Sequence, residues 1–278
     1  MASKRPSASQ VHRQTAKKMI AVCSATGGTG RTTLTVNTAS LLAAKSKKVT
    51  AIDGDLQFGD LSLAMDIQPD VTIKDTVHLQ EREKLIDLCN RHESGVRVLS
   101  APSRPEEADL ITEEHLDWVI TSLKEANEYL LVDTAAGLND RSLPFIENAD
   151  HIVVVTTGGM AALKNAKLMI GILEELELNG KISVVVNRST AKGSLIKEDL
   201  TSLLQAERVF YLPEDRKHVS HSQNTGQVLC LNYPRLEISK AIMSMAEELF
   251  PETHYGTPYI PHKRFQRIIQ RVTSRRRK

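Results

Sequence analysis

The sequence M-I-A-V-C-S-A-T-G-G-T-G-R-T-T, residues 19–33, decides the fold of this 278-residue chain. Its first part, 19–25, is a short apolar run of the kind that forms a buried β-strand. Its second part, 26–33, is a glycine-rich loop, and a segment of helical periodicity at about 31–45 follows it. A strand, a tight loop and a helix in this order begin a βαβ unit, the repeating element of parallel sheets.

The rest of the chain continues this alternation. Further short apolar runs predict strands at 48–53, 96–100, 129–133, 151–157, 181–187 and 208–212. Longer segments of helical period predict helices at about 113–126, 161–177, 195–205 and 235–249. Several of the strands are continuous β-branched runs, which is typical of parallel strands buried on both faces. The sequence therefore predicts an α/β fold with a mostly parallel sheet and helices on both of its faces.

The loop T-G-G-T-G-R-T-T has the features of a phosphate-binding loop. Gly27, Gly28 and Gly30 let the backbone turn tightly and approach a ligand closely. The helix that follows directs its free N–H groups and the positive end of its dipole at the same place, which favours phosphate. Thr32 stands where a P-loop hydroxyl coordinates Mg²⁺. A simple strand-to-helix turn is the alternative, but the hydroxyl pair at the start of the helix favours phosphate binding.

Carboxylates follow two other predicted strands. The strand at 48–53 ends in D-G-D, which places Asp53 and Asp55 there, and the strand at 129–133 ends in Asp133. Such side chains at strand ends beside the glycine loop can hold a metal and orient a water for attack on a γ-phosphate. A single Asp could instead cap the next helix. Two such sites beside one glycine loop favour the metal site.

The composition is ordinary for a globular protein, with 41% hydrophobic and 25% charged residues. Three cysteines at unrelated spacings argue against a disulfide framework or a zinc site. No apolar run approaches the ~18 residues that span a bilayer. We therefore expect a cytoplasmic protein.

The charge is distributed unevenly. Residues 1–18 carry five Lys or Arg and no acidic residue, and residues 263–278 carry eight and no acidic residue. The segment between them has 23 basic and 34 acidic residues, a net charge of −11. An acidic body with two basic ends is typical of tails that meet an anionic surface.

These motifs resemble the MinD/ParA family of deviant Walker A P-loop ATPases over roughly 19–250. The stretch D-L-Q-F-G-D-L, 55–61, is most similar to the pilus-assembly branch called CpaE or TadZ. The resemblance implies ATP and Mg²⁺ as cofactors and an ATP-dependent homodimer. It implies a metal site at Thr32, Asp53 and Asp133. It also implies nucleotide contacts from the P-loop, and from Asn187 and Pro213 around the base; the P-loop residues are Gly27, Gly28, Thr29, Gly30, Arg31, Thr32 and Thr33.

Two positions depart from the family pattern. The signature lysine, which reaches the phosphates of the partner subunit, is replaced by Thr26, and the lysine on the β- and γ-phosphates is replaced by Arg31. Arginine keeps the charge but presents a planar fork instead of a compact ammonium. We therefore expect nucleotide binding with slow hydrolysis. Arg31, Asp55 and Asp53 are the candidate catalytic residues, with Asp55 the first choice for positioning water and Asp53 the second.

The chain is predicted to end in a basic amphipathic helix. Phe265, Ile268, Ile269 and Val272 lie at i, i+3, i+4 and i+7, so they form one narrow apolar stripe among Lys, Arg and Gln. A helix of this kind lies in a membrane interface. Packing on the acidic body and binding of nucleic acid are the alternatives. The predicted organisation is a flexible basic arm, a P-loop ATPase domain, a proline-containing linker and this tail helix, at 1–18, 19–250, 251–262 and 263–278.

The leading functional prediction is an ATP-dependent spatial regulator, peripheral on the inner face of the cell membrane. It would place a polar machine, such as a Tad/Flp-type pilus, through a protein partner that the sequence does not identify. A ParA-type DNA-partitioning ATPase, a non-hydrolysing ATP-bound scaffold and a flagellar-number regulator of the same family are the alternatives.

Overall fold

The computed structural model describes residues 17–189 and 197–251. Most of the predicted basic arm, the linker after Pro251 and the predicted tail helix with Phe265, Ile268, Ile269 and Val272 lie outside the described residues. In the described part of the chain, no helix has both the length and the apolar character needed to cross a bilayer.

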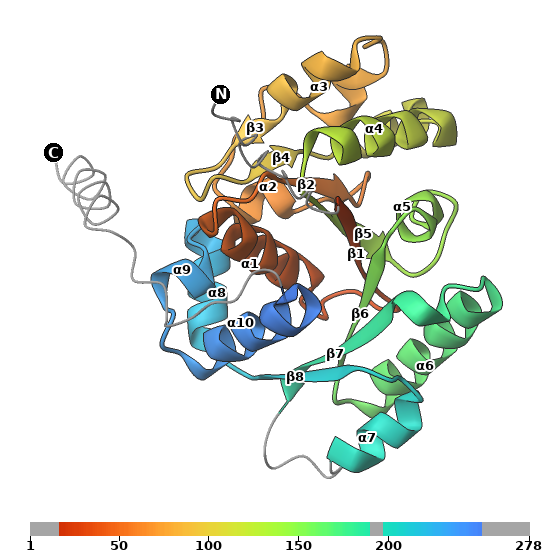
Figure 1. Cartoon of the computed structure of the whole chain (residues 1–278), viewed down its shortest axis with the longest axis vertical. Helices are drawn as coiled ribbons and strands as arrows, with labels where there is room; N and C mark the ends of the chain where they lie inside the picture. Colours follow the sequence, from red (N-terminus) through yellow and green to blue (C-terminus); the bar gives the residue numbers. More distant parts are fainter. Residues whose placement is uncertain (1–16, 190–196, 252–278) are drawn as a thin grey trace, which may run out of the picture.

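The described chain forms one eight-stranded sheet in the order β3-β4-β2-β5-β1-β6-β7-β8 (Figure 1). All neighbouring strands are parallel except the short β3, which is antiparallel to β4. This confirms the predicted mostly parallel sheet. The strands are β1 (Lys18–Ser24), β2 (Val49–Gly54), β3 (Asn90–Arg91), β4 (Arg97–Leu99), β5 (Tyr129–Ala136), β6 (His151–Thr157), β7 (Ile182–Ser189) and β8 (Val209–Pro213).

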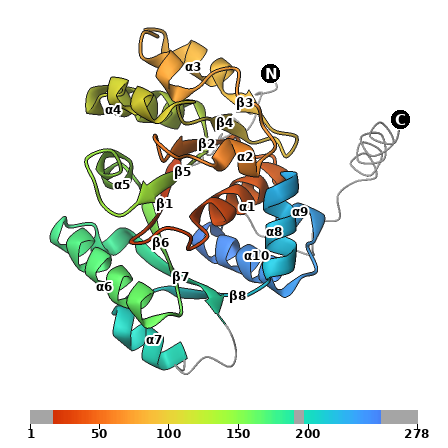
Figure 2. The ribbon, with the colours of Figure 1, turned by 180° about the vertical axis from the view of Figure 1, so that it is seen from behind.

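Helices cover both faces of the sheet, as predicted (Figures 1 and 2). One face carries α1 (Arg31–Ala44), α2 (Leu61–Ala64), α8 (Arg216–Thr225), α9 (Leu229–Asn232) and α10 (Glu237–Leu249). The other carries α3 (Arg82–Leu88), α4 (Glu113–Ala126), α5 (Leu143–Glu147), α6 (Met160–Glu175) and α7 (Lys197–Leu204). Three short 3₁₀ helices complete the described chain, at Ile73–Thr76, Pro105–Leu110 and Asn179–Lys181.

The central strand β1 contributes side chains to the hydrophobic core on both faces of the sheet. Ile20 and Val22 belong to the cluster beneath α1 and α10, whereas Ala21 and Cys23 belong to the cluster beneath α6. Alternate side chains of a strand point to opposite faces, so an entirely apolar strand is buried from both sides. All three cysteines are buried and free, and burial raises the pKa of each thiol to about 12. None of them is therefore available as a thiolate at neutral pH.

The last helix is fixed to the sheet by an aromatic pair. The Phe250 ring lies edge-on to the Tyr129 ring, with their centroids 5.5 Å apart, and both side chains are fully buried. Because Tyr129 is the first residue of β5, α10 ends at the edge of the sheet where the parallel strands begin.

We predict that Phe250→Ala lowers the free energy of unfolding by about 3–5 kcal/mol, because it leaves a cavity under α10. Phe58→Ala is the matched control, since that side chain is 73% exposed, and it should change stability by less than about 0.5 kcal/mol. Urea unfolding of both variants measures the difference. Equal effects of the two substitutions would contradict the role of the Phe250 contact.

Candidate functional site

The P-loop lies at the centre of the sheet. It follows β1, which β5 and β6 flank, and it leads directly into α1. Gly28 and Gly30 have φ values of +71° and +102°, in the left-handed region where L-residues with side chains are strained. A Cβ at Gly30 would also collide with the side-chain amide of Asn187. The backbone conformation at position 30 therefore favours glycine, and a side chain there would also have to displace the Asn187 amide.

Two buried carboxylates stand beside the loop. Asp53 and Asp133 are directly opposite one another in the parallel register of β2 and β5, and both are buried. Thr32 donates its hydroxyl to Asp133 Oδ2 at 2.5 Å, and the Leu61 amide donates to Asp53 Oδ2 at 3.0 Å. The Oδ1 atoms of both carboxylates are buried without a hydrogen-bond partner among the described residues. Buried oxygens of this kind are costly unless a ligand or cation satisfies them.

The environment makes both carboxylates hard to ionise. Burial raises the pKa of Asp133 to about 7, although the Thr32 hydrogen bond and the charge of Arg31 act in the opposite direction. Burial and the neighbouring Asp133 raise the pKa of Asp53 well above its ordinary value. A divalent cation between the two side chains would reverse this effect, because it favours the ionised form.

The guanidinium group of Arg31 lies close to these acidic side chains. Its Nη1 donates to Ser24 Oγ at 2.7 Å, and its guanidinium nitrogens lie 4.0 Å from Asp55 Oδ2 and from Asp133 Oδ1. The buried Nε has no hydrogen-bond partner within the described residues. The predicted phosphate-binding cation is therefore present in the site, and Ser24, which sequence reasoning missed, holds it at the base of the loop.

Asp55 and Asp53 occupy different environments. The Asp55 side chain is 24% exposed and its Oδ1 accepts the Phe58 amide at 3.2 Å. Asp53 is covered by Gly59, where a Cβ would collide with the carboxyl group. Of the two candidates for positioning water, Asp55 thus has solvent access and Asp53 does not. Asp55 stays the predicted first choice for positioning water.

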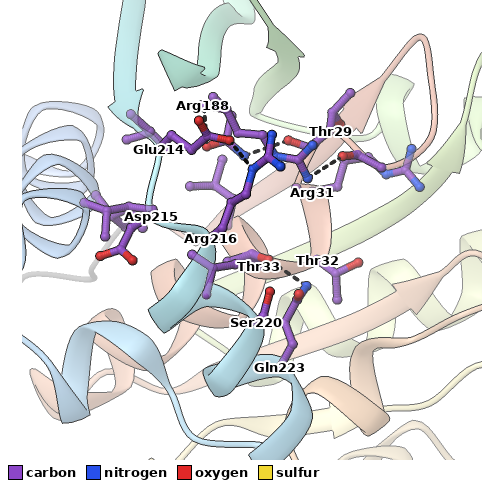
Figure 3. Close-up of a pocket in the computed structure, with 18 of the residues that line it drawn as sticks. Thr29, Arg31, Thr32, Thr33, Arg188, Glu214, Asp215, Arg216, Ser220 and Gln223 are labelled. Atoms are coloured by element: carbon purple, nitrogen blue, oxygen red, sulfur yellow. Dashed lines mark hydrogen bonds and ion pairs between the residues drawn. The ribbon is translucent and has the colours of Figure 1, made fainter. Parts of the chain in front are cut away.

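A cavity of about 600 Å³ lies next to the loop (Figure 3). Residues of α1 and the P-loop form one wall, and residues from the β8–α8 region face them (Figure 3). Gln223 Nε2 connects the two walls by donating to Thr33 Oγ1 at 3.0 Å. The apolar part of the lining is Leu34, Leu212, Pro213, Val219, Ile238 and Ile242. A polar loop joined to an apolar recess of this size suits a ligand with a phosphate chain and a flat base.

The end of β7 is hydrogen-bonded to the P-loop. Asn187 Nδ2 donates to the Thr29 carbonyl at 2.7 Å, and Arg188 Nη2 donates to the Gly28 carbonyl at 3.0 Å. Asn187 and Pro213 both line the cavity, as the resemblance predicts for residues near the base. The Asn187 amide nitrogen, however, is bonded to the loop in this structure, so contact with a base would require that bond to be shared or exchanged.

Several lining residues were missed by sequence reasoning. Arg188 follows the predicted Asn187, Arg216 lies three residues after the predicted Pro213, and Gln223 lies in α8, but none of the three was predicted to line the site. Arg216 is paired with Glu214 at 2.6 Å. Only the polar character of this region could have indicated them, and that character equally fits an exposed loop.

The predicted metal ligands fit Mg²⁺ only together with a phosphate ligand. Thr32 and Asp133 touch, and Asp53 stands beside Asp133. No group of three His, Cys, Asp or Glu that could hold a metal is found within 17–189 and 197–251. Mg²⁺ commonly uses one or two carboxylates, a hydroxyl, waters and substrate phosphates. The hydroxyl of Thr32 and the unpartnered oxygens of the two Asp side chains match that donor set.

The raised pKa of Asp133 leads to a stability prediction. A carboxyl whose pKa is higher in the folded than in the unfolded state stabilises the fold when protonated, and this contribution is lost as pH rises from about 4 through about 7. Asp133→Asn keeps an acceptor for Thr32 and carries no charge. In EDTA, the variant should exceed the wild type in stability by an amount that grows over this range, to about 1–3 kcal/mol.

Thermal unfolding at acidic and at mildly alkaline pH measures this difference. A gap between variant and wild type that is independent of pH would show that Asp133 is not held in its neutral form by burial.

Comparison with known proteins agrees with this geometry. Residues 20–229 match the sequence profile of the CobQ/CobB/MinD/ParA nucleotide binding domain. An uncharacterized ATP-binding protein of Methanocaldococcus jannaschii is 30% identical over 232 residues, which cover 83% of this chain and 86% of that protein. The septum site-determining protein MinD of Synechocystis is 29% identical over 226 residues, covering 77% of this chain and 82% of that protein.

A solved structure shows the same fold. The septum site-determining protein MinD of Pyrococcus horikoshii, complexed with Mg-ADP, superposes with a TM-score of 0.76 at 23% identity. The match covers 87% of this chain and 99% of that one. With its P-loop, strand-end carboxylates and matched profile, this chain belongs to the CobQ/CobB/MinD/ParA family of nucleotide-binding domains.

Proposed function

We propose that the protein binds ATP with Mg²⁺ and acts as a nucleotide-dependent switch that associates with membrane and hydrolyses ATP slowly. The observation that carries this proposal is the pair of buried, adjacent carboxylates beside a glycine loop, one of them bonded to the P-loop hydroxyl of Thr32. The Mg-ADP bound to the similar MinD of Pyrococcus horikoshii supports the same ligands here.

Each part of the site has a role in nucleotide binding. The backbone amides of the P-loop and the start of α1 bind the phosphates. Thr32, Asp133 and Asp53 hold Mg²⁺ directly or through water, and Mg²⁺ neutralises phosphate charge. The apolar recess by Pro213 receives the base. Isothermal titration calorimetry tests the proposal: ATP with Mg²⁺ should give heat, Thr32→Ala should weaken the Mg²⁺-dependent part, and no heat from the wild type would overturn it.

Slow hydrolysis follows from the charges at the loop. Thr26 is half-buried, and its carbonyl accepts the Ser24 hydroxyl at 2.7 Å. Because the threonine side chain carries no charge, no cation stands at the position of the signature lysine. Arg31 faces Asp55 and Asp133, which partly offset its charge. Positive groups that stabilise a transferring phosphoryl group can be worth ~10³-fold or more in rate. The site is therefore suited to binding ATP and poorly suited to hydrolysing it quickly.

We predict that Thr26→Lys raises the rate of ATP hydrolysis by about tenfold or more, because it supplies a cation that can reach the phosphates of a partner subunit. Thr26→Gln is the control of similar length without charge, and it should leave the rate unchanged. Steady-state phosphate release, measured above and below the dimerisation concentration, gives the comparison. Equal rates in the two variants would contradict the role assigned to the missing lysine.

Membrane association is proposed from the C-terminal tail. Four apolar side chains contribute at most ~1.5–3 kcal/mol each, and less at a wet interface. Nearby Lys and Arg add about 1 kcal/mol each on anionic lipid. One tail therefore binds reversibly, whereas two tails on an ATP-bound dimer bind much more tightly, because the second attachment is intramolecular. ATP binding thus favours the membrane-bound form, and loss of nucleotide releases it.

Replacing Ile268 and Ile269 with Glu should abolish sedimentation with anionic liposomes in ATP, because it places charge in the apolar stripe. The matched control replaces Gln266 and Gln270, on the polar side of the predicted helix, with Glu, which makes the same change in net charge. The control should sediment only slightly less than the wild type. Equal sedimentation of both variants and the wild type would remove the membrane proposal.

A protein partner is proposed from the surface beside the site. Phe58 and Leu63, in and next to the 55–61 stretch, are 73% and 71% exposed. Exposed apolar residues next to a nucleotide site are suited to a partner that senses the bound state. Together with the resemblance of this stretch to the pilus-assembly branch, they support placement of a polar machine such as a pilus; a flagellar-number regulator would use the same surface.

Two rival functions are separated by direct measurements. A ParA-type partitioning ATPase would bind nonspecific DNA more strongly than anionic liposomes at matched salt. A scaffold that uses ATP only structurally would keep the same oligomeric state with ATP, with ADP and without nucleotide. The tail stripe favours lipid over DNA, and the incompletely satisfied Asp53 and Asp133 favour a site that changes on ligand binding.

A further inference from the structure

Three large apolar side chains form an exposed row at the end of α6. Leu168, Ile172 and Leu176 are 57%, 47% and 41% exposed, and their spacing of four residues places them along one face of the helix. The α6 side chains that pack on the sheet lie on another face; they are Leu163, Ala166, Met169, Ile170 and Leu173. We call Leu168, Ile172 and Leu176 the α6 row. Apolar side chains that lie exposed together are suited to contact with a second apolar surface.

The end of α6 is also acidic. Residues 168–180 contain Glu174, Glu175 and Glu177 and no Lys or Arg. These glutamates are exposed, and they form no ion pair with another described residue. The predicted tail helix, 263–278, has the opposite character, with eight Lys or Arg, no acidic residue and one apolar stripe. The α6 row and the tail therefore complement one another both in apolar surface and in charge.

The tail is attached within reach of the α6 row. α6 connects the end of β6 to the start of β7, and these strands are parallel, so its last turn lies at the edge where the strands begin. Phe250 packs on Tyr129, the first residue of β5, at the same edge.

The distance can be estimated from the strand order. Three strand spacings separate β5 from β7, which is about 15 Å, and passing from the α10 face to the outside of α6 on the other face adds roughly 10 Å (Figure 1). The eleven residues 252–262 span up to about 36 Å when extended. The predicted linker is therefore long enough to bring the tail onto the α6 row of the same chain.

We propose that the C-terminal tail, 263–278, docks its apolar stripe on the α6 row of its own chain and that this docking competes with lipid. The competition rests on the proposed membrane association, whereas the docking does not. Three observations carry the inference: the exposed row, the unpaired glutamates beside it, and the attachment of the tail at the edge of the sheet where α6 ends.

Docking and membrane binding exclude one another. The predicted tail helix has a single apolar stripe, which can cover the α6 row or enter a bilayer interface but cannot do both. The apparent affinity for lipid is then reduced in proportion to the fraction of tails that are free. Since the linker holds the tail near the row, docking takes place at a high effective concentration. The two tails of an ATP-bound dimer, which bind lipid cooperatively, would compete better with docking than one tail.

Crosslinking in the absence of lipid tests the docking itself. The row variant of the full chain is Ile172→Cys with Ile268→Cys. The control is Met160→Cys with Ile268→Cys, because Met160 is 62% exposed at the other end of α6. The three native cysteines are buried, so a short bismaleimide reacts mainly with the introduced ones. The row variant should form about fivefold more crosslink within one chain than the control. Equal yields in the two variants would overturn the inference, and so would crosslinks only between chains, which would make a second copy the occupant.

Vesicle binding in ATP tests the competition. Leu168→Gln with Ile172→Gln removes the row without a change in net charge, and the control, Leu110→Gln with Met160→Gln, removes two exposed apolar side chains elsewhere. The row variant should bind vesicles of phosphatidylglycerol and phosphatidylcholine about three- to tenfold more tightly than the wild type, and the control within about twofold of it, because only the row variant frees the tail. ATP titration checks that both variants fold.

The outcomes separate the docking from the membrane proposal. Unchanged or weaker vesicle binding by the row variant would overturn the competition, since weaker binding would place the α6 row itself on the lipid. If neither the wild type nor the row variant binds vesicles but the crosslink within one chain still forms, the membrane proposal fails and the docking is supported.

Discussion

The structure is organised around two carboxyl groups that are buried side by side at the carboxyl ends of two parallel strands. Asp53 and Asp133 are neighbours in register and are buried, so ionising both without a cation is unfavourable. The rest of the site surrounds this pair: Thr32 and the Leu61 amide satisfy one oxygen of each, and Arg31 supplies a positive charge. Without ligand the pair reduces stability at neutral pH. With Mg²⁺ and phosphate present, the two carboxylates would hold the metal ion.

The order of strands explains how this pair came to lie beside the P-loop. β5 is inserted between β1 and β2, so the ends of all three strands meet at the centre of the sheet. The sequence predicted glycine or aspartate at or near the ends of these three strands, but it did not predict the order of the strands. The cavity was harder to predict, since its second wall comes from the β8–α8 region. The α8 segment R-K-H-V-S-H-S-Q-N-T is polar on most sides and has no clear apolar period.

Other differences between sequence and structure have similar causes. β3 has two residues and α2, α5 and α9 have four or five, too few to show a periodicity. The predicted partners of Arg31 and Asn187 were phosphate and base, and in the structure these side chains also bond to Ser24 and to Thr29. Sequence patterns indicate which groups belong to a site. They do not show which hydrogen bonds these groups form with one another.

The close contact between Gly30 and Asn187 couples two distant parts of the chain. A Cβ at position 30 would meet the Asn187 amide, which donates to the Thr29 carbonyl. A substitution at Gly30 would therefore disturb both the loop and the end of β7, although the two positions are 157 residues apart in the chain.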